Sequence, residues 1–597
     1  MSAPEERTAL PQPASLYAYA LRLQRAEPDD RLPKGGYSLP DAPERRARPS
    51  RDWRESEEAA RKALEPLLAE ADTARAAEEV DRRLREAGVN SRHIFSVVDT
   101  MTLPDEEQAR TLGRRLTRSG TTAYAVGTGI ALLTRLGEPE DVPYLRTLGL
   151  LRGFTRHAIR ALDTIDAPTA ALLWLGCYTG ESELRPLIDA LTARDDEAAR
   201  AGLLRVPMDP RAVDSAIARR IAESVLLSDV LRDEPVDEGI LAQGARLLAR
   251  MTSPRHYEAE IRSYRDAVTV YTAVIAQTSR LTPSLDHYAT LLTLALDLHS
   301  GPSVLLDWRP GQREALLDAL DSLLTTPDWA AVLDAREPAG PAERRRLRWA
   351  RRTARQPFTA RPDTFRLRIE VVVRDPADPD IVETRFLVDG RPLVPEAFGR
   401  GPGHSPEHLL HSGSLRATAD GQEVQLAEAY CTEGCCGALF VTIRRDGDEV
   451  VWGGWRGTSK GVVLPEYRFD AAAYDAEIGR AETDHSWAWP ARTTARLITN
   501  GLRESPDVVS RWRLSRGRAD TDFSDPDTVV VWFFFQPEED GPWLQFSWQL
   551  PDDGTPPEAR AAAVLRRLAE EDPKGYAKIS GGSREYAEQL GFPWPEG

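Results

Sequence analysis

Residues 341–373 read PAERRRLRWARRTARQPFTARPDTFRLRIEVVV, and the periodicity of the chain changes within this stretch. The residues before about 355 show no alternation of apolar and polar positions. The last nine residues alternate, with apolar side chains at Phe365, Leu367, Ile369, Val371 and Val373. A period of two is typical of a half-buried strand, and a period near 3.6 is typical of a helix. The segment 355–362 therefore separates a helical part of the chain from a part that contains strands.

Upstream of this boundary, from residue 52 to about 355, apolar residues recur at helical spacing. Residues 284–299 are an example, and Thr282 and Pro283 are placed to cap that helix and to open its first turn. Short loops with Gly, Pro or Asp separate such segments, so we expect consecutive helices to pack antiparallel. The apolar stripe of the example consists of Leu285, Tyr288, Leu292, Ala295 and Leu298.

An internal repeat lies within the helical part. Gly137, Glu138, Glu140 and Pro143 recur 43 residues later as Gly180, Glu181, Glu183 and Pro186. A period of ~40–47 residues is typical of HEAT and armadillo units. The segment 121–193 resembles the HEAT-repeat family, and we extend the resemblance to residues 52–356. It implies an α-solenoid, a curved stack of HEAT-like helical repeats with a concave binding face, and it implies no chemistry.

Downstream of the boundary the pattern predicts an α+β region with antiparallel hairpins. Strands are expected at 365–373 and 381–388, and Asp446-Gly447 marks a hairpin turn between 439–443 and 449–452. A further hairpin joins 529–535 to 543–550, and helices are expected near 490–502, 557–571 and 583–590. We therefore predict four parts: a tail at 1–51 with a short helix near 15–25, a helical repeat domain at 52–356, a β-rich domain with a cysteine cluster at 357–478, and a C-terminal α+β domain at 479–597.

The composition is that of a globular multidomain protein. The 597 residues are 41% hydrophobic and 29% charged, and the formal net charge is −17. A negative balance opposes binding to nucleic acid and to anionic membranes but is compatible with a basic protein partner. The N-terminus lacks an apolar signal segment and only 4 residues are cysteine, so we expect a cytoplasmic location. The high arginine content suggests the codon bias of a high-GC bacterial genome.

Three of the four cysteines, Cys431, Cys435 and Cys436, lie within six residues. Thiolates at positions i and i+4 can converge on a soft metal, and His408 could add an imidazole, which would make a zinc site. The spacing is not that of a zinc finger, however. The alternative, which we favour, is that the cysteines are buried as small hydrophobic residues and that no cofactor is bound. The surrounding sequence, 429–452, is similar to a turn-and-hairpin segment of uncharacterised high-GC bacterial proteins, and this resemblance implies no activity.

Arginine is concentrated between 344 and 355, where Trp349 interrupts the run. Such residues can follow a phosphate backbone while the indole stacks on a base. The ordinary alternative is a solvated helix whose arginines pair with acidic neighbours. We take Arg345, Arg348, Trp349 and Arg352 as candidate partner-binding residues.

The sequence favours a protein–protein interaction protein that binds its partner on the solenoid face, as a toxin-neutralising, immunity or defence-associated protein or as a scaffold. The alternative is an enzyme. One form would act on nucleic acid, since HEAT-like alkylpurine DNA glycosylases keep an Arg-lined concave face and Leu306-Asp307-Trp308 supplies residue types that they use. The other would be a tailoring enzyme with a cysteine nucleophile and His485 as its base. No Walker A, GxSxG or HExxH motif occurs.

Overall fold

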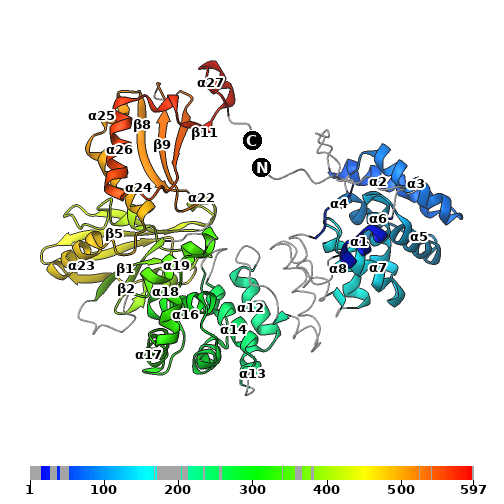
Figure 1. The fold of residues 1–597 in the computed structure, drawn as a ribbon, viewed down its shortest axis with the longest axis horizontal. Coiled ribbons are helices and arrows are strands. Elements are labelled where there is room, and N and C mark those ends of the chain that lie inside the picture. Colours follow the sequence, from blue (N-terminus) through cyan, green and yellow to red (C-terminus); the bar gives the residue numbers. More distant parts are fainter. Residues whose placement is uncertain are drawn as a thin grey trace. The chain divides into compact units, whose positions relative to one another are not determined.

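The computed structural model describes residues 15–26, 36–40, 53–89, 91–166, 169–170, 203–204, 213–232, 236–253, 259–338, 340–355, 366–377, 382–429, 431–522, 525–538 and 541–594. The chain divides into two compact units (Figure 1). Unit 1 comprises Met1–Ser253 and Glu260–Leu281, and unit 2 comprises the rest. Among the described residues, no helix is long and apolar enough to cross a membrane.

The described part of unit 1 is built from helices. They are α1 (Leu16–Ala26), α2 (Trp53–Leu68), α3 (Thr73–Ala87), α4 (Ser91–Thr100), α5 (Glu106–Ser119), α6 (Ala123–Leu136), α7 (Val142–Leu148), α8 (Thr155–Ile165), α12 (Ser215–Ser224), α13 (Leu227–Val230), α14 (Glu238–Met251) and α15 (Ala267–Ala276), with 3-10 turns at Pro139–Asp141, Glu260–Arg262 and Thr278–Arg280. The predicted helical character of the N-terminal half is confirmed, as is the short helix near residues 15–25.

Local sequence explains where these helices begin. The Asp72 carboxylate accepts hydrogen bonds from the first free N–H groups of α3, and Asp105 and Thr122 do the same for α5 and α6. The first copy of the 43-residue repeat follows α6, where Glu138 and Glu140 form salt bridges with Arg114 of α5. The second copy, at 180–186, lies outside the described residues.

Helices of unit 1 pack in a regular order along the chain. α2, α4, α6 and α8 each contact the next member of that series, and α3, α5 and α7 do so in a second series. The two series also touch each other, since α2 packs on α3 and α5 packs on α6. An apolar core that includes Leu64, Val80, Ile94, Leu112 and Leu132 runs between them.

Unit 2 opens with four helices, α16 (Leu285–Ser300), α17 (Gln312–Leu324), α18 (Pro327–Asp334) and α19 (Pro341–Thr353), and a 3-10 turn at Pro302–Leu305. The cap of α16 differs from the prediction, because the hydroxyl of Ser284, and not that of Thr282, accepts the N–H of His287. Thr282 and Pro283 precede the cap. The helical stripe itself is confirmed: Tyr288, Leu292, Ala295 and Leu298 are buried, and Leu285 in the first turn is half-buried.

The boundary expected at 356/357 falls inside unit 2, since α16 and α19 are joined to the strand region by buried polar contacts. Arg385 donates a hydrogen bond of 2.9 Å to the Leu296 carbonyl of α16. His299 lies 3.0 Å from a carboxylate oxygen of Glu370, and the Trp349 indole N–H donates to the Val373 carbonyl. A buried polar group needs its partner, so these helices belong structurally with the strands.

Three antiparallel sheets follow in unit 2. The first has the order β1 (Leu367–Val373), β2 (Val382–Val388), β3 (Arg391–Pro392); the second β4 (Gln422–Glu428), β5 (Ala438–Asp446), β6 (Glu449–Arg456), β7 (Tyr467–Asp470); and the third β11 (Lys578–Gly582), β10 (Leu544–Leu550), β9 (Val529–Phe535), β8 (Leu514–Thr521). The predicted antiparallel hairpins are confirmed. Asp446 pairs with Glu449, so the turn residues are Gly447-Asp448, one position later than expected, and Gly447 has a φ of 61°.

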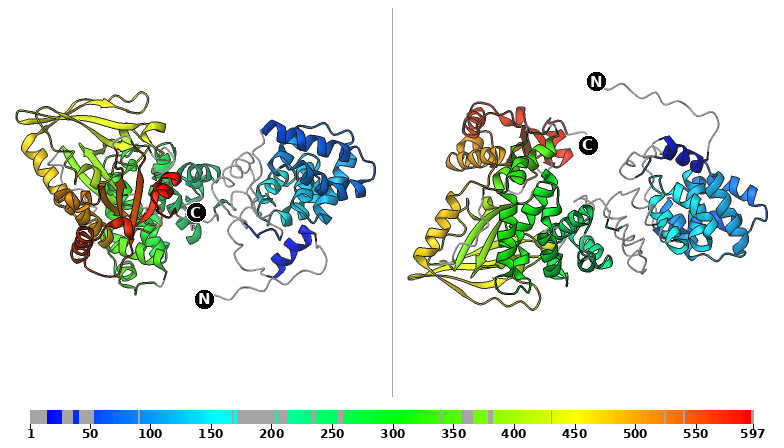
Figure 2. Two further views of the ribbon diagram at one scale, coloured as in Figure 1. Left: turned by 90° about the horizontal axis from the view of Figure 1, so that it is seen from above. Right: turned by 60° about the horizontal axis from the view of Figure 1, so that its bottom comes forward.

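Helices cover the sheets of unit 2. They are α20 (Leu393–Ala397), α21 (Pro406–Leu409), α22 (Glu433–Cys436), α23 (Ala471–Thr483), α24 (Pro490–Glu504), α25 (Asp507–Ser510), α26 (Pro557–Glu570) and α27 (Arg584–Gln589), with a 3-10 turn at Pro573–Gly575. α23 runs beside β1, β6 and β7, as the gold helix in Figure 2 shows. α24 packs on β8 and β9, and α26 packs on α24 (Figure 1). The first two sheets share one core, around Trp452, and the third sheet has its own core, around Phe533.

Candidate functional site

A cavity of about 400 Å³ lies in unit 2, where α19 faces the start of α24 and the loops that flank the third sheet. We call it the Arg/Trp pocket. Its lining includes all four candidate partner-binding residues of the sequence analysis. The lining residues are Arg345, Arg348, Trp349, Arg352, Val373, Pro376, Trp489, Pro490, Ala491, Pro526, Asp527 and Asp552.

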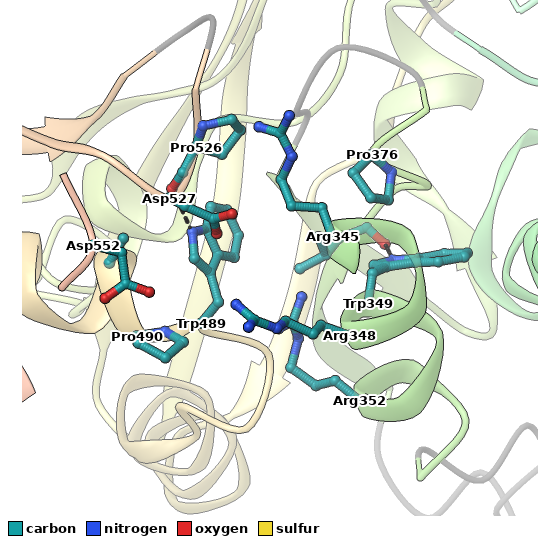
Figure 3. Close-up of a pocket in the computed structure, with 12 residues that line it drawn as sticks. Arg345, Arg348, Trp349, Arg352, Pro376, Trp489, Pro490, Pro526, Asp527 and Asp552 are labelled. Carbon is teal, nitrogen blue, oxygen red and sulfur yellow. Dashed lines mark hydrogen bonds between the residues drawn. The ribbon is translucent and has the colours of Figure 1, made fainter. Parts of the chain in front are cut away.

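Helix α19 supplies one wall because of how its residues are spaced. Positions 345, 348, 349 and 352 follow the i, i+3, i+4, i+7 pattern that places side chains on one face of a helix. Figure 3 shows the three arginines of this set reaching toward the cavity from that side. Arg346 and Arg351 lie on other faces, where Arg346 pairs with Asp286 and Asp375 and Arg351 donates to backbone carbonyls.

Two tryptophans form apolar surfaces of the pocket and are themselves fixed. Trp349 is only 1% exposed and donates its indole N–H to the Val373 carbonyl at 2.8 Å. Trp489, the residue before α24, is 8% exposed and donates to the Pro526 carbonyl at 2.8 Å. Both rings are therefore mostly buried and are held in place by these hydrogen bonds. The tryptophans therefore give the pocket rigid flat walls.

Two of the three pocket arginines have carboxylate partners. Arg348 forms a double hydrogen bond with Glu337, both contacts at 3.0 Å, and this raises the pKa of Arg348. Arg345 lies 3.4 Å from a carboxylate oxygen of Asp525. Arg345 and Arg348 thus pair with acidic neighbours, as one of the two interpretations of the sequence expected. Arg352 is the exception.

Arg352 has no hydrogen bond or ion pair with any residue that the structure describes. Its Nε atom is buried without a partner, and its guanidinium carbon lies 5.7 Å from the centre of the Trp489 ring. Burial lowers the pKa of Arg352 to about 10, against the opposing charge of Asp527. The group remains protonated at neutral pH, so the pocket contains a largely buried positive charge that no ion pair with a described residue holds. Such a charge is costly unless a ligand pairs with it.

Asp527 faces the arginines across the cavity (Figure 3). Burial raises the pKa of Asp527, although Arg345 and Arg348 lower it. Within the described part of the chain no ion pair holds this carboxylate. The pocket thus has a cationic wall from α19, a smaller acidic opposite wall, and indole and proline surfaces between them.

The second wall of the pocket was not predicted from the sequence. Pro490 was expected only as the start of the helix 490–502, and neither Trp489 nor Asp527 was singled out. These residues are separated from α19 by 136 or more positions in the sequence, and no spacing rule connects them. The one signal available was Pro490, since proline is favoured in the first turn of a helix and so places Trp489 at its N-cap.

The three clustered cysteines meet at the connection between β4 and β5. Their Sγ atoms all lie within 4.8 Å of one another, so this cluster could hold a metal ion. The Sγ atoms of Cys435 and Cys436 are 3.7 Å apart. Hydrogen bonding with Cys436 lowers the pKa of Cys431, and the same contact raises the pKa of Cys436 to about 11.

The expectation that these cysteines are buried was wrong. Cys431 and Cys435 are exposed and Cys436 is half-buried, because the short helix α22 stands at the end of the hairpin and has no buried residue. His408 is not part of the cluster. Its ring stacks on His404 with the ring centres 4.2 Å apart.

A second cavity, of about 470 Å³, lies between the segment 410–416 and helix α24. His411, His485 and Arg496 line it, and each has a buried ring or side-chain nitrogen without a partner in the described chain. Burial lowers the pKa of His411 to about 4 and also lowers that of His485. No cysteine is among the described residues that line this cavity, so His485 is not placed there as the base of a cysteine nucleophile.

Comparison with protein-family models, with curated proteins and with solved structures gives no match for this chain. The function must therefore be argued from the sites themselves.

Proposed function

We propose that the protein is a protein-binding protein and that the Arg/Trp pocket receives a carboxylate-bearing segment of its partner. The observation that carries this proposal is Arg352, whose Nε atom is buried and whose guanidinium has no hydrogen-bond or ion-pair partner among the described residues. A carboxylate can accept two parallel hydrogen bonds from a guanidinium, and in a desolvated pocket this pairing is strong.

The volume and the lining residues of the Arg/Trp pocket suit a peptide segment that inserts one or two side chains. Ligand pockets usually measure ~300–1,000 Å³ and combine apolar walls with a few polar groups, and the Arg/Trp pocket is within this range at about 400 Å³. An apolar group next to the carboxylate would lie against Trp489, while Asp527 could accept a hydrogen bond from a backbone N–H of the segment. A C-terminal carboxylate and an acidic side chain share this chemistry.

The charge pattern favours a peptide over nucleic acid. Following a phosphate backbone requires several free cations, whereas Arg345, Arg346 and Arg348 are each held by a carboxylate. Binding is also favoured over catalysis, because no His, Ser, Cys or Lys is found among the described residues that line the pocket. A metal ion at the cysteine cluster, for which the sequence suggested zinc, would brace the β4–β5 connection and take no part in this pocket.

We also propose that α2–α8 form a HEAT-like α-solenoid that offers a second binding face. The two parallel series of contacts, α2-α4-α6-α8 and α3-α5-α7, support this, because each repeat of a solenoid contacts mainly its neighbours. The net charge of −17 suits a basic partner at that face. An immunity, defence or scaffolding role is compatible with both surfaces.

The experiment is a titration of the purified full chain, followed by tryptophan fluorescence, with three acetylated tetrapeptides. One ends in Phe with a free carboxylate, the second is its C-terminal amide, and the third is an amide with an internal Glu. We expect the first or the third to bind and the uncharged amide not to bind, and the arm that binds identifies the source of the carboxylate.

The matched variants are Arg352→Gln in the pocket and Arg355→Gln, which changes an exposed arginine of the same segment outside it. Loss of one partner of a desolvated charge pair typically costs ~2 kcal/mol or more, which is ~30-fold or more in affinity. Arg352→Gln should weaken binding by this amount and Arg355→Gln should leave it unchanged. Equal affinity in both variants, or no binding of either carboxylate peptide, would contradict the proposal.

A further inference from the structure

The cysteine cluster is a separate feature from the Arg/Trp pocket and has a chemistry of its own. We propose that Cys431, Cys435 and Cys436 bind one thiophilic metal ion of tetrahedral preference, such as zinc, through three thiolates, with one coordination position left open to an outside ligand. This inference does not depend on the proposed function.

Distances between the sulfur atoms suit a shared ion. With metal–sulfur bonds of ~2.3 Å, three ligands of a tetrahedral ion have sulfur–sulfur distances of about 3.8 Å. The Sγ atoms of Cys435 and Cys436 are already 3.7 Å apart, and all three lie within 4.8 Å of one another. The sulfur–sulfur distances therefore need to shorten by at most about 1 Å for the three atoms to share one ion.

Hydrogen bonds to the backbone and one glycine hold the cysteine segment in place, and these hydrogen bonds do not involve the sulfur atoms. The Glu428 carboxylate accepts the N–H of Glu433 at 2.7 Å, and Arg400 donates to the Cys436 carbonyl at 3.1 Å. Gly437 has a φ of 93°, a conformation that other residues rarely adopt, and it returns the chain to β5 immediately after the third cysteine. The cysteines are thus positioned without contributing to an apolar core.

The exposure of the cysteines favours a binding site over cysteines that only fill space in a core. Clustered thiols that fill space would be buried, but Cys431 and Cys435 are exposed. Structural zinc sites are closed by four protein ligands, whereas sites with three protein ligands keep a position for an exchangeable ligand. No fourth His, Cys, Asp or Glu joins the group within the described residues, so the open position follows from the donor set.

The test uses the reduced full chain and Zn²⁺, with Cd²⁺ as a second probe that reports thiolate binding by its ultraviolet charge-transfer band. We expect one equivalent to bind in competition with a chromophoric chelator. Binding should protect Cys431, Cys435 and Cys436 from alkylation, which mass spectrometry of the digested chain reads at each residue.

Single Cys→Ser variants at the three positions should each lower the Zn²⁺ affinity at least tenfold and abolish or shift the Cd²⁺ band. The matched control is Cys177→Ser, which removes the remaining cysteine and should leave both readouts unchanged. Because alkylation protection is measured on the unaltered chain, the test does not depend on the folding of a variant. Equal alkylation with and without metal, or equal metal binding by the triple Ser variant, would overturn the proposal.

Discussion

At the scale of single residues, the pocket is defined by which charges have partners. Arg345 and Arg348 are ion-paired, and Arg352 is not paired with any described residue. Sequence spacing could place the arginines on one helical face. It could not show which of them would be paired, because the partners Asp525 and Glu337 come from other elements and pairing is decided by the tertiary structure.

A first prediction concerns Trp349, whose indole N–H bonds the Val373 carbonyl in a buried setting. Trp349→Phe keeps an aromatic ring but leaves that carbonyl without its donor, which should cost about 1–3 kcal/mol of unfolding free energy. The control is Trp455→Phe, since Trp455 donates to Pro465 in an exposed setting where water can replace it. Urea unfolding of the full chain measures both. A cost for Trp455→Phe as large as that for Trp349→Phe would contradict this explanation.

At the scale of secondary-structure elements, polar contacts join α16 to the first sheet. Burial would raise the pKa of Glu370, but hydrogen bonding to His299 and the charges of His299 and Arg368 hold it at about 2. The folded pKa is thus below the ordinary value of 4.5, so the ionised carboxylate stabilises the folded state. This stabilisation is complete above pH 4.5 and is lost as the pH falls toward 2.

The corresponding prediction is that Glu370→Gln lowers the unfolding free energy of unit 2 at pH 7 by about 3 kcal/mol. This figure follows because the pKa of Glu370 is lowered by about 2.5 pH units and each unit corresponds to ~1.36 kcal/mol. The difference between variant and unaltered protein should shrink between pH 4.5 and 2, where the natural side chain also loses its charge. Unfolding midpoints measured across this pH range test the sign. A difference that grows as the pH falls would show that the ion pair is not the cause.

Strong periodicity explains which elements were predictable. α16, β1 and β10 were predictable because their apolar residues keep the period of a helix or of a strand. The burial is less regular than the sequence pattern: α16 is buried on nearly all sides, and in β1 Val372 is buried while Val371 and Val373 are half-buried. β8 (LSRGRADT) and β11 (KISGG) have no such alternation and form because their backbones pair with β9 and β10. Residues 580–582 belong to β11, and Ser583 caps the helix that was expected near 583–590.

At the scale of the whole molecule, the division between the units follows packing and not the change in periodicity. The sequence placed a boundary at 356 because helices stop there. α16 and α19 nevertheless make hydrogen bonds to the first sheet, and contacts between residues so far apart in the sequence leave no local pattern.

Fragments test this division. We expect 282–597 to be soluble and folded and to keep the Arg/Trp pocket, whereas 357–597 loses Trp349 and Arg352 and exposes the surface that α19 covers. For the same reason 1–281 should be a cleaner helical fragment than 52–355, which carries α16–α19 without their sheets. Size-exclusion chromatography and circular dichroism provide the comparison. A well-folded 357–597 would mean that α16–α19 are not needed by the sheets.

The central claim is that the Arg/Trp pocket binds an anionic group through Arg352. Its most direct test compares one substitution that removes a positive charge from the pocket with one that removes a negative charge. The measurement is the dissociation constant of the carboxylate tetrapeptide for the full chain, for Arg352→Gln and for Asp527→Asn. We predict weaker binding for Arg352→Gln and tighter binding for Asp527→Asn, because the asparagine keeps an oxygen that can accept the ligand's N–H but removes a negative charge that faces the ligand's carboxylate. Weaker binding for Asp527→Asn with unchanged or tighter binding for Arg352→Gln would show that the pocket selects a cationic group and would contradict the claim.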